Sequence, residues 1–251
     1  MAGNTPWVGD GDNKLYLQSG QFSATMKTSV AVGTVDANPT GIAWDGTNSP
    51  WCGFESDKLY LQSGQFSGTL KTSRGTGTTS PRAVSNTAAL HSPWCDDSPN
   101  KIYLQSGQFS ATVKTSVNIN AIDSTIYGCS WDGTNTPWVG SQSDKLYLQS
   151  GQFSATLKTS VSVTGVDTEP NGISWDQANT PWSGTTDNKL YLQSGQFSGT
   201  LKTSLTVTGV DGNPQDIDNT TRLAAAGPST AQIMAVRSLT ATGGMIGRQD
   251  I

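Results

Sequence analysis

Residues that commonly carry catalysis are scarce in this chain of 251 residues. It has one histidine, His91, and only two glutamates, Glu55 and Glu169. General acid–base catalysis and Ser-His-Asp triads depend on a positioned histidine, and most glycosidases need a pair of carboxylates. Both glutamates fall in expected turns, and the histidine has no recognisable partners. The sequence therefore predicts no catalytic residues, and we expect that the protein is not an enzyme.

Patterns that bind metals or cofactors are also missing. The chain has three cysteines, and Cys52 and Cys95 hold the same place in neighbouring repeats. A ring of repeats would keep them too far apart for a disulfide, which needs Cα atoms roughly 4.4–6.8 Å from each other. Aspartate-rich turns, such as the one at residues 10–13, lack the spacing of a calcium loop. We expect free cysteines, no metal ion and no cofactor.

Neither a basic cluster nor a long apolar run is present. The net charge is -4, and ten of the fifteen cationic residues are lysines at two fixed places in each repeat. No apolar stretch approaches the roughly 18 residues of a membrane span. The first six residues lack the charged and apolar pattern of a secretory signal. These absences predict no nucleic-acid partner, no membrane span and no classical signal peptide.

What the chain does have is a repeat. The segment Lys-Leu-Tyr-Leu-Gln-Ser-Gly-Gln-Phe-Ser begins at Lys14, Lys58, Lys145 and Lys189, and Lys101 begins a copy with isoleucine in place of the first leucine. Successive copies are separated by 44, 43, 44 and 44 residues. A period of this length is typical of repeat architectures. The repeat predicts one domain of five similar units over residues 1–221, followed by a non-repeat tail over residues 222–251.

Residues 128–161 show that one unit contains four short strands. Trp131 and Trp138 flank a turn of Asp, Gly and Asn, which indicates a hairpin. Residues 145–149 and 153–159 then alternate apolar and polar side chains, as strands do. Four strands in about 40–45 residues are typical of a β-propeller blade. We therefore predict an all-β, five-bladed propeller with four antiparallel strands per blade, and burial between blades of Leu146, Leu148, Phe153 and Leu157.

The two ends of the repeat region complement each other. The chain starts part-way through a unit, because residues 5–9 match a second strand and no first strand precedes them. The missing strand is found near Ile217, where residues 214–221 align with residues 170–177 after the shared Gly-Val-Asp. A strand at Ile217 would close the ring. An open solenoid of five units is the alternative, but solenoids carry polar caps at their ends.

The tail has no aromatic residue and cannot form a core of its own. One interpretation is a strand laid over the ring or a frayed terminus. The other is an arm that docks onto a partner protein, which is favoured because its apolar residues would otherwise be exposed. The candidate docking residues are Ile233, Met234, Val236, Leu239, Met245 and Ile246.

The tryptophans allow two interpretations. Trp7, Trp51, Trp94, Trp138 and Trp182 recur in all five units, and three units carry an additional tryptophan. Filling the core between blades is the favoured role, because aromatic residues dominate burial. The repeated tyrosines are expected to cover the next sheet with their hydroxyls in water. The alternative is a set of stacking platforms for sugars, whose candidate residues are Trp44, Trp51, Trp131, Trp138, Trp175 and Trp182, with Asp45, Asp132 and Asp176.

The pattern Trp-Asp-Gly-Thr-Asn-Thr-Pro-Trp followed by Asp-Lys-Leu-Tyr-Leu-Gln-Ser-Gly resembles the tandem propeller repeats of bacteriophage and bacterial surface appendages, which are related to NHL-type blades. This resemblance covers residues 5–221 and implies a binding or structural role. We expect a virion or appendage protein, located on a virion or extracellular surface, whose partners are other assembly proteins bound through the tail. The alternative is a multivalent lectin that binds cell-surface glycans.

Overall fold

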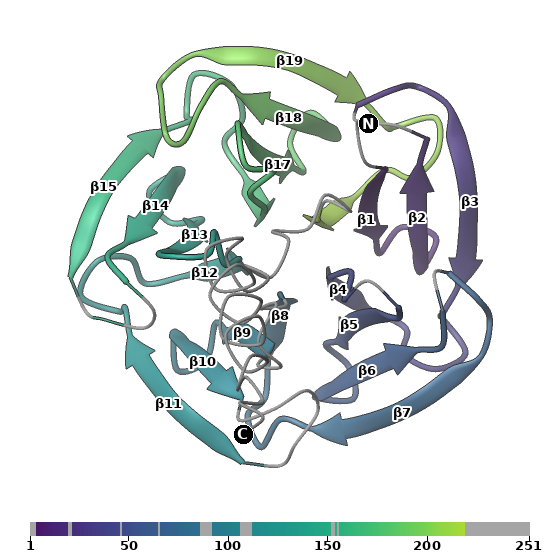
Figure 1. The fold of residues 1–251 in the computed structure, drawn as a ribbon. Helices are drawn as coiled ribbons and strands as arrows, with labels where there is room; N and C mark the ends of the chain where they lie inside the picture. Colours follow the sequence, from purple (N-terminus) through teal and green to yellow (C-terminus); the bar gives the residue numbers. More distant parts are fainter. Residues whose placement is uncertain are drawn as a thin grey trace, which may run out of the picture.

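The computed structural model describes residues 4–19, 22–45, 47–64, 66–85, 92–105, 112–151, 154 and 156–218. Within these ranges the chain forms twenty β-strands in five four-stranded antiparallel sheets, arranged as blades around an axis (Figure 1). The described part has no helix of the length and apolarity needed to cross a membrane. The predicted five-bladed β-propeller is therefore confirmed. The candidate docking residues of the tail and His91 lie outside the described ranges.

Each blade runs from an inner strand beside the axis to an outer strand at the rim (Figure 1). In that order the first blade contains β20 (Pro214–Ile217), β1 (Thr5–Gly9), β2 (Lys14–Gln18) and β3 (Met26–Ala31). The second contains β4 (Pro39–Ile42), β5 (Ser49–Gly53), β6 (Lys58–Gln62) and β7 (Leu70–Gly75). The third contains β8 (Pro81–Val84), β9 (Ser92–Asp96), β10 (Lys101–Gln105) and β11 (Val113–Asn118).

The fourth blade contains β12 (Ile126–Cys129), β13 (Thr136–Gly140), β14 (Lys145–Gln149) and β15 (Leu157–Ser162). The fifth contains β16 (Pro170–Ile173), β17 (Thr180–Gly184), β18 (Lys189–Gln193) and β19 (Leu201–Thr206). The turn before each third strand ends on an Asn or Asp with a φ of 49–58°. Asn and Asp tolerate this left-handed conformation better than most residues, which explains why one of them precedes the lysine in every unit.

The ring is closed by a strand from the far end of the repeat region. Strand β20 pairs antiparallel with β1, so that Trp7 faces Ile217 and Val8 faces Asp216. The backbone N–H of Asp218 also donates to the carbonyl oxygen of Pro6 at 2.9 Å. The predicted completion of the first blade by a strand near Ile217 is confirmed, and the open solenoid is excluded.

The tryptophan shared by all five units is a core residue. In each blade it stacks on the tyrosine of the third strand, with ring centroids 4.1–4.2 Å apart. Its indole Nε1–H donates to the glutamine that ends that strand, at 2.9–3.2 Å. Burying an indole requires a partner for this donor. The Trp, Tyr and Gln of the repeat are thus one packing unit, and the core-filling prediction is confirmed.

The leucines of the third strand pack on the opposite face. Leu146 and Leu148 lie in one cluster with Trp182 and Tyr191 of the next blade, so these two predicted interblade contacts are confirmed. Leu157 is an error of the sequence analysis, because its side chain is 38% exposed. The outer strand starts at Leu157, beside a bulge at Gln149, and Leu157 lies at the rim. Val161 is the residue of this strand that packs against the cluster. Phe153 lies outside the described residues.

In four of the five links between blades, an aspartate forms hydrogen bonds with the following blade. Asp211 accepts hydrogen bonds from the backbone N–H groups of Gly11 at 3.2 Å and Asp12 at 3.0 Å, and from the Tyr16 hydroxyl at 3.0 Å. Asp167 accepts the Tyr191 hydroxyl at 3.0 Å in the same way. The hydroxyls of Tyr60 and Tyr147 also have protein partners, Ser56 and Ser143, each at 2.7 Å. The expectation that the tyrosine hydroxyls reach water is therefore wrong for these four blades. Four links carry such an aspartate, and we call it the link aspartate: Asp36, Asp123, Asp167 and Asp211.

Candidate functional site

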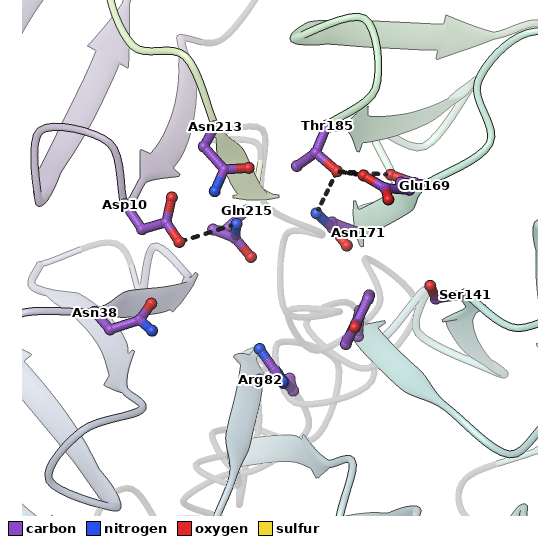
Figure 2. A pocket seen from close by; sticks show the side chains of 10 residues that line it. Asp10, Asn38, Arg82, Ser141, Glu169, Asn171, Thr185, Asn213 and Gln215 are labelled. Atoms are coloured by element: carbon purple, nitrogen blue, oxygen red, sulfur yellow. Dashed lines mark hydrogen bonds between the residues drawn. The ribbon is translucent and has the colours of Figure 1, made fainter.

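A polar hollow of about 250 Å³ lies on the axis at the end where the inner strands begin. All five blades contribute to its wall (Figure 2). The hollow suits an occupant the size of one sugar ring or one amino-acid side chain. The lining residues are Asp10, Asn38, Arg82, Tyr127, Ser141, Glu169, Asn171, Thr185, Asn213 and Gln215.

The wall is built from positions of the repeat at which the blades differ, although Thr40, Phe54 and Asp97 occupy such positions without lining the hollow. The second residue of the inner strand is different in every blade: Thr40, Arg82, Tyr127, Asn171 and Gln215. The residue that follows the second strand also changes from blade to blade: Asp10, Phe54, Asp97, Ser141 and Thr185. The third strand, by contrast, reads Lys-Leu-Tyr-Leu-Gln in four blades and differs by one methyl position in the fifth. Variation among the repeats includes the wall of the hollow but extends beyond it, because the outer-strand residue opposite the repeat lysine also differs in every blade: Ala31, Gly75, Asn118, Ser162 and Thr206.

The inner strands leave little space below the hollow. At their third position four blades have glycine or alanine, and a Cβ on Gly172 would lie 2.4 Å from the Cα of Asp216 in the next strand. Real Cβ atoms do not approach a backbone atom this closely, so the strands meet with small residues in contact.

The charge of Arg82 is neutralised inside the wall. Its Nη2 lies 2.6 Å from Oδ2 of Asp97 and its Nε donates to the same oxygen at 2.7 Å. The guanidinium also lies 4.4 Å from the ring centre of Phe54 and 4.8 Å from that of Tyr127. Charge-assisted hydrogen bonds and aromatic faces together hold an arginine firmly. Arg82 is thus a fixed part of the wall.

Two further carboxylates line the hollow. Asp10 Oδ2 accepts a hydrogen bond from Gln215 Nε2 at 3.2 Å, and Glu169 Oε2 accepts one from the Thr185 hydroxyl at 2.9 Å (Figure 2). Burial raises the pKa of Asp10, and the nearby Asp211 adds to that effect. The sequence analysis placed Glu169 in a turn and gave it no role. A comparison of the repeats position by position would have found it, because the other blades have Asn, Ser or Thr there.

A carboxyl group lies on the axis in strand β20. Asp216 is 1% exposed, and its Oδ2 accepts the backbone N–H of Ile42 at 3.0 Å. Its Oδ1 has no hydrogen-bond partner within the described residues. Burial raises the pKa of Asp216 well above its ordinary value, and the neighbouring Asp218 raises it further. Asp216 therefore holds a proton in the folded protein at pH values where it would be ionised in the unfolded chain.

Asp216→Asn is expected to flatten the pH dependence of stability. Between about pH 4 and the raised pKa, the folded protein binds a proton that the unfolded chain has released, so stability falls as pH rises through this window. Asparagine keeps the acceptor for the Ile42 N–H and removes the titration. The melting temperature of the variant minus that of the wild type should increase by about 3 °C for each pH unit that the pH is raised within this window. Thermal unfolding from pH 4 to 8 measures this difference, and parallel curves would contradict it.

All three cysteines are free and buried, as predicted. Burial is the main reason that the pKa values of the Cys52 and Cys95 thiols are raised, which keeps both groups protonated and unreactive. Among the described residues no group of three or more His, Cys, Asp or Glu side chains is placed to hold a metal ion.

The predicted tryptophan platforms divide into two groups. Trp51, Trp138 and Trp182 are completely buried, so a ligand cannot reach their ring faces, and their selection as binding residues was wrong. The reason is the stack on the tyrosine, which occupies one ring face, while the neighbouring blade covers the other. Trp44, Trp131 and Trp175 are half-buried and lie at the opposite end of the ring from the hollow. A sugar-binding site that uses the indole rings of both tryptophans of one blade therefore does not form.

The predicted binding aspartates cap turns. Asp132 Oδ1 accepts the backbone N–H groups of Thr134 at 2.7 Å and Asn135 at 2.5 Å, and its Oδ2 accepts the Asn135 side chain at 3.3 Å. Asp45 and Asp176 make the equivalent bonds in their own blades. This is the hydrogen-bonding pattern of an Asx turn. These carboxylates stabilise the hairpin and already have internal partners.

Comparison with known proteins shows only the fold. No family model and no curated protein sequence matches the chain. Among solved structures, a chain of a nidogen/laminin complex is similar with a TM-score of 0.59 and 10% identity, covering 86% of this chain and 97% of that one. The glutaminyl cyclase of Myxococcus xanthus is similar with a TM-score of 0.51 and 10% identity, covering 80% of this chain and 74% of that one. Since one of these proteins is an enzyme, the fold alone does not decide between binding and catalysis.

Proposed function

We propose that the protein is a non-catalytic binding protein that holds a sugar-sized polar ligand in the axial hollow. The observation that carries this proposal is that the five blades bring different polar side chains together around one hollow on the axis. If these positions served packing alone, five equivalent sites would favour the same residue, as the Trp, Tyr and Gln positions do. A ligand without five-fold symmetry instead requires a different side chain from each blade.

The chemistry of the wall favours a carbohydrate. Amides, hydroxyls and carboxylates dominate it, with the Tyr127 ring among them. Sugars are bound by such groups, because each hydroxyl both donates and accepts hydrogen bonds and the ring carbons contact aromatic faces. We thus place the carbohydrate-binding site of the lectin interpretation in the axial hollow and not at the tryptophans, and we expect one site per ring.

A blocking substitution tests the site. Ser141→Trp places a large side chain in the wall, and Thr134→Trp makes a comparably large change on an exposed turn at the other end of the ring. Monosaccharides and free amino acids are screened by ligand-observed NMR against the wild type and both variants. We expect binding to the wild type and to Thr134→Trp, and a loss of at least tenfold in affinity for Ser141→Trp. Absence of binding, or equal binding by both variants, would contradict the proposal.

The role in a virion or appendage, with docking through residues 222–251, stays a prediction from the sequence. It is compatible with a ligand-binding ring, because a receptor-binding module needs both an attachment and a recognition site. A chain ending at Asp218 that still assembles with the partner of the full-length protein would contradict docking through the tail.

A further inference from the structure

Three hydrogen-bond donors in the wall of the hollow are used within the wall. Gln215 Nε2 donates to Asp10, and Asn171 Nδ2 donates to the Thr185 hydroxyl at 3.3 Å. The Thr185 hydroxyl in turn donates to Glu169. Each of these bonds consumes a hydrogen, and Figure 2 shows the amide oxygen of Gln215 on the side away from Asp10. The carboxylates of Asp10 and Glu169 and the amide oxygen of Gln215 keep lone pairs that can accept from an occupant, and other amides and hydroxyls of the wall keep hydrogens that can donate.

Asn38 adds an acceptor without a partner. Its side-chain oxygen is shielded from solvent and accepts no hydrogen bond from any described residue. Asn38 lines the hollow from the second blade, beside Asp10 (Figure 2). A buried acceptor without a donor costs about 1–3 kcal/mol. A ligand in the hollow reaches this oxygen only if the Asn38 side chain turns towards the hollow.

The charges around the hollow are unbalanced. Asp10 and Glu169 contribute two negative charges, and the charge of Arg82 is already paired with Asp97, which lies behind the wall and does not line the hollow. No other cationic side chain is present among the described lining residues. Two carboxylates at the edge of a polar cavity favour a positively charged occupant, because Coulomb attraction strengthens as water is excluded.

We infer that the axial hollow selects a ligand that carries a primary ammonium group. This inference rests on the proposed function and names the chemistry of the ligand. An ammonium group offers three donors and no acceptor, which matches a wall that has spare acceptors and two unbalanced carboxylates. The group could come from an amino sugar or from a lysine side chain, and the experiment separates these sources.

Isothermal titration calorimetry at pH 7 with four probes tests the inference. Glucosamine and glucose differ by an ammonium against a hydroxyl at one carbon, N-acetylglucosamine keeps the nitrogen without its charge, and Nα-acetyl-lysine carries the ammonium without a sugar. We expect glucosamine to bind at least tenfold more tightly than glucose and N-acetylglucosamine. Comparable binding of Nα-acetyl-lysine would support the ammonium as the shared chemistry, with lysine as a possible source.

Isosteric variants of the two lining carboxylates test whether they cause the preference for an ammonium group. Asp10→Asn and Glu169→Gln keep the oxygens that accept from Gln215 and Thr185 and remove one charge each. In both, the ratio of glucosamine to glucose affinity should fall by about three- to tenfold. Asp187→Asn is the matched control, since its exposed carboxylate pairs with Lys189 and does not line the hollow. It should leave the ratio unchanged.

The outcomes separate this inference from the proposed function. Glucose binding as tight as glucosamine binding, abolished by Ser141→Trp, would overturn the ammonium selectivity and leave the binding function in place. If none of the four probes binds and the monosaccharide screen is also negative, both are overturned. If Asp187→Asn lowers the ratio of glucosamine to glucose affinity as much as the two hollow variants do, the preference for glucosamine comes from the net charge of the protein. That result would overturn selection by the hollow.

Discussion

A chain that ends at Gly212 is expected to lose cooperative folding, whereas a chain that ends at Asp218 keeps it. The six additional residues contain strand β20, which supplies the inner strand of the first blade. Without it, the edge of β1 is unpaired, and Trp7 loses its contact with Ile217. Burial of Ile217 alone contributes about 2 kcal/mol. The blade also loses its inner backbone pairing and the contacts of β20 with β4 and β16.

The loss is large compared with the stability of an ordinary domain, which is about 5–15 kcal/mol. Thermal and urea unfolding, followed by tryptophan fluorescence, compare the two truncated chains directly. Because both lack residues 219–251, the tail makes no difference between them. We expect one sharp transition for the longer chain and a broad transition, at least about 10 °C lower, for the shorter chain. Equal midpoints would show that the closing strand is dispensable.

The fold could be predicted because its determinants are repeated. The period, the alternation in Lys145–Gln149 and the incomplete first unit are all visible as shared residues, and they specify the number of blades and the closure. Leu157 was misplaced because strand alternation alone does not show where a bulge shifts the register. The burial of Trp182 against Tyr191 likewise depends on the pairing of two strands that the sequence only suggests.

The hollow could not be predicted from the features that the repeats share. Arg82, Tyr127, Asn171 and Gln215 look unrelated in sequence, and only the ring brings them together around the hollow. The residues that the repeats share describe the packing of the blades, as Trp, Tyr and Gln do. The proposed recognition site depends instead on residues that differ between blades, so it could be found only after the ring had placed them around one hollow.

One exchange between repeats shows how strict the packing is. In four blades the second strand ends in glycine, and a Cβ at Gly184 would lie 2.4 Å from Oδ2 of the link aspartate Asp167. The third blade reverses this arrangement: its second strand ends in Asp96, and Thr78 replaces the link aspartate when the links are aligned on the following proline. Asp96 is fully buried, and its charge adds to burial in raising the pKa of the Tyr103 hydroxyl. Each blade thus has one carboxylate beside its tyrosine, which is supplied by the preceding link in four blades and by the second strand in the third blade.

This exchange predicts a strong coupling between residues 184 and 167. Gly184→Asp alone forces a second carboxylate into an occupied space and should cost about 4 kcal/mol or more. Asp167→Thr alone removes the acceptor for the Tyr191 hydroxyl and for backbone N–H groups and should cost about 2 kcal/mol. The double variant reproduces the residue pair of the third blade. It should therefore be at least about 2 kcal/mol more stable than the sum of the two changes predicts.

Urea unfolding of the four proteins in this double-mutant cycle measures the coupling, provided that the m-values agree. Gly199→Asp is a suitable control for the added charge, because a Cβ at Gly199 meets no atom within 4 Å. Its effect should be small and should add to that of Asp167→Thr. Additive free energies for residues 184 and 167 would mean that the two carboxylates do not compete for one space. Coupling of the expected size would show that the irregular third blade keeps the same interaction as its neighbours, with the carboxylate supplied by the strand in place of the link.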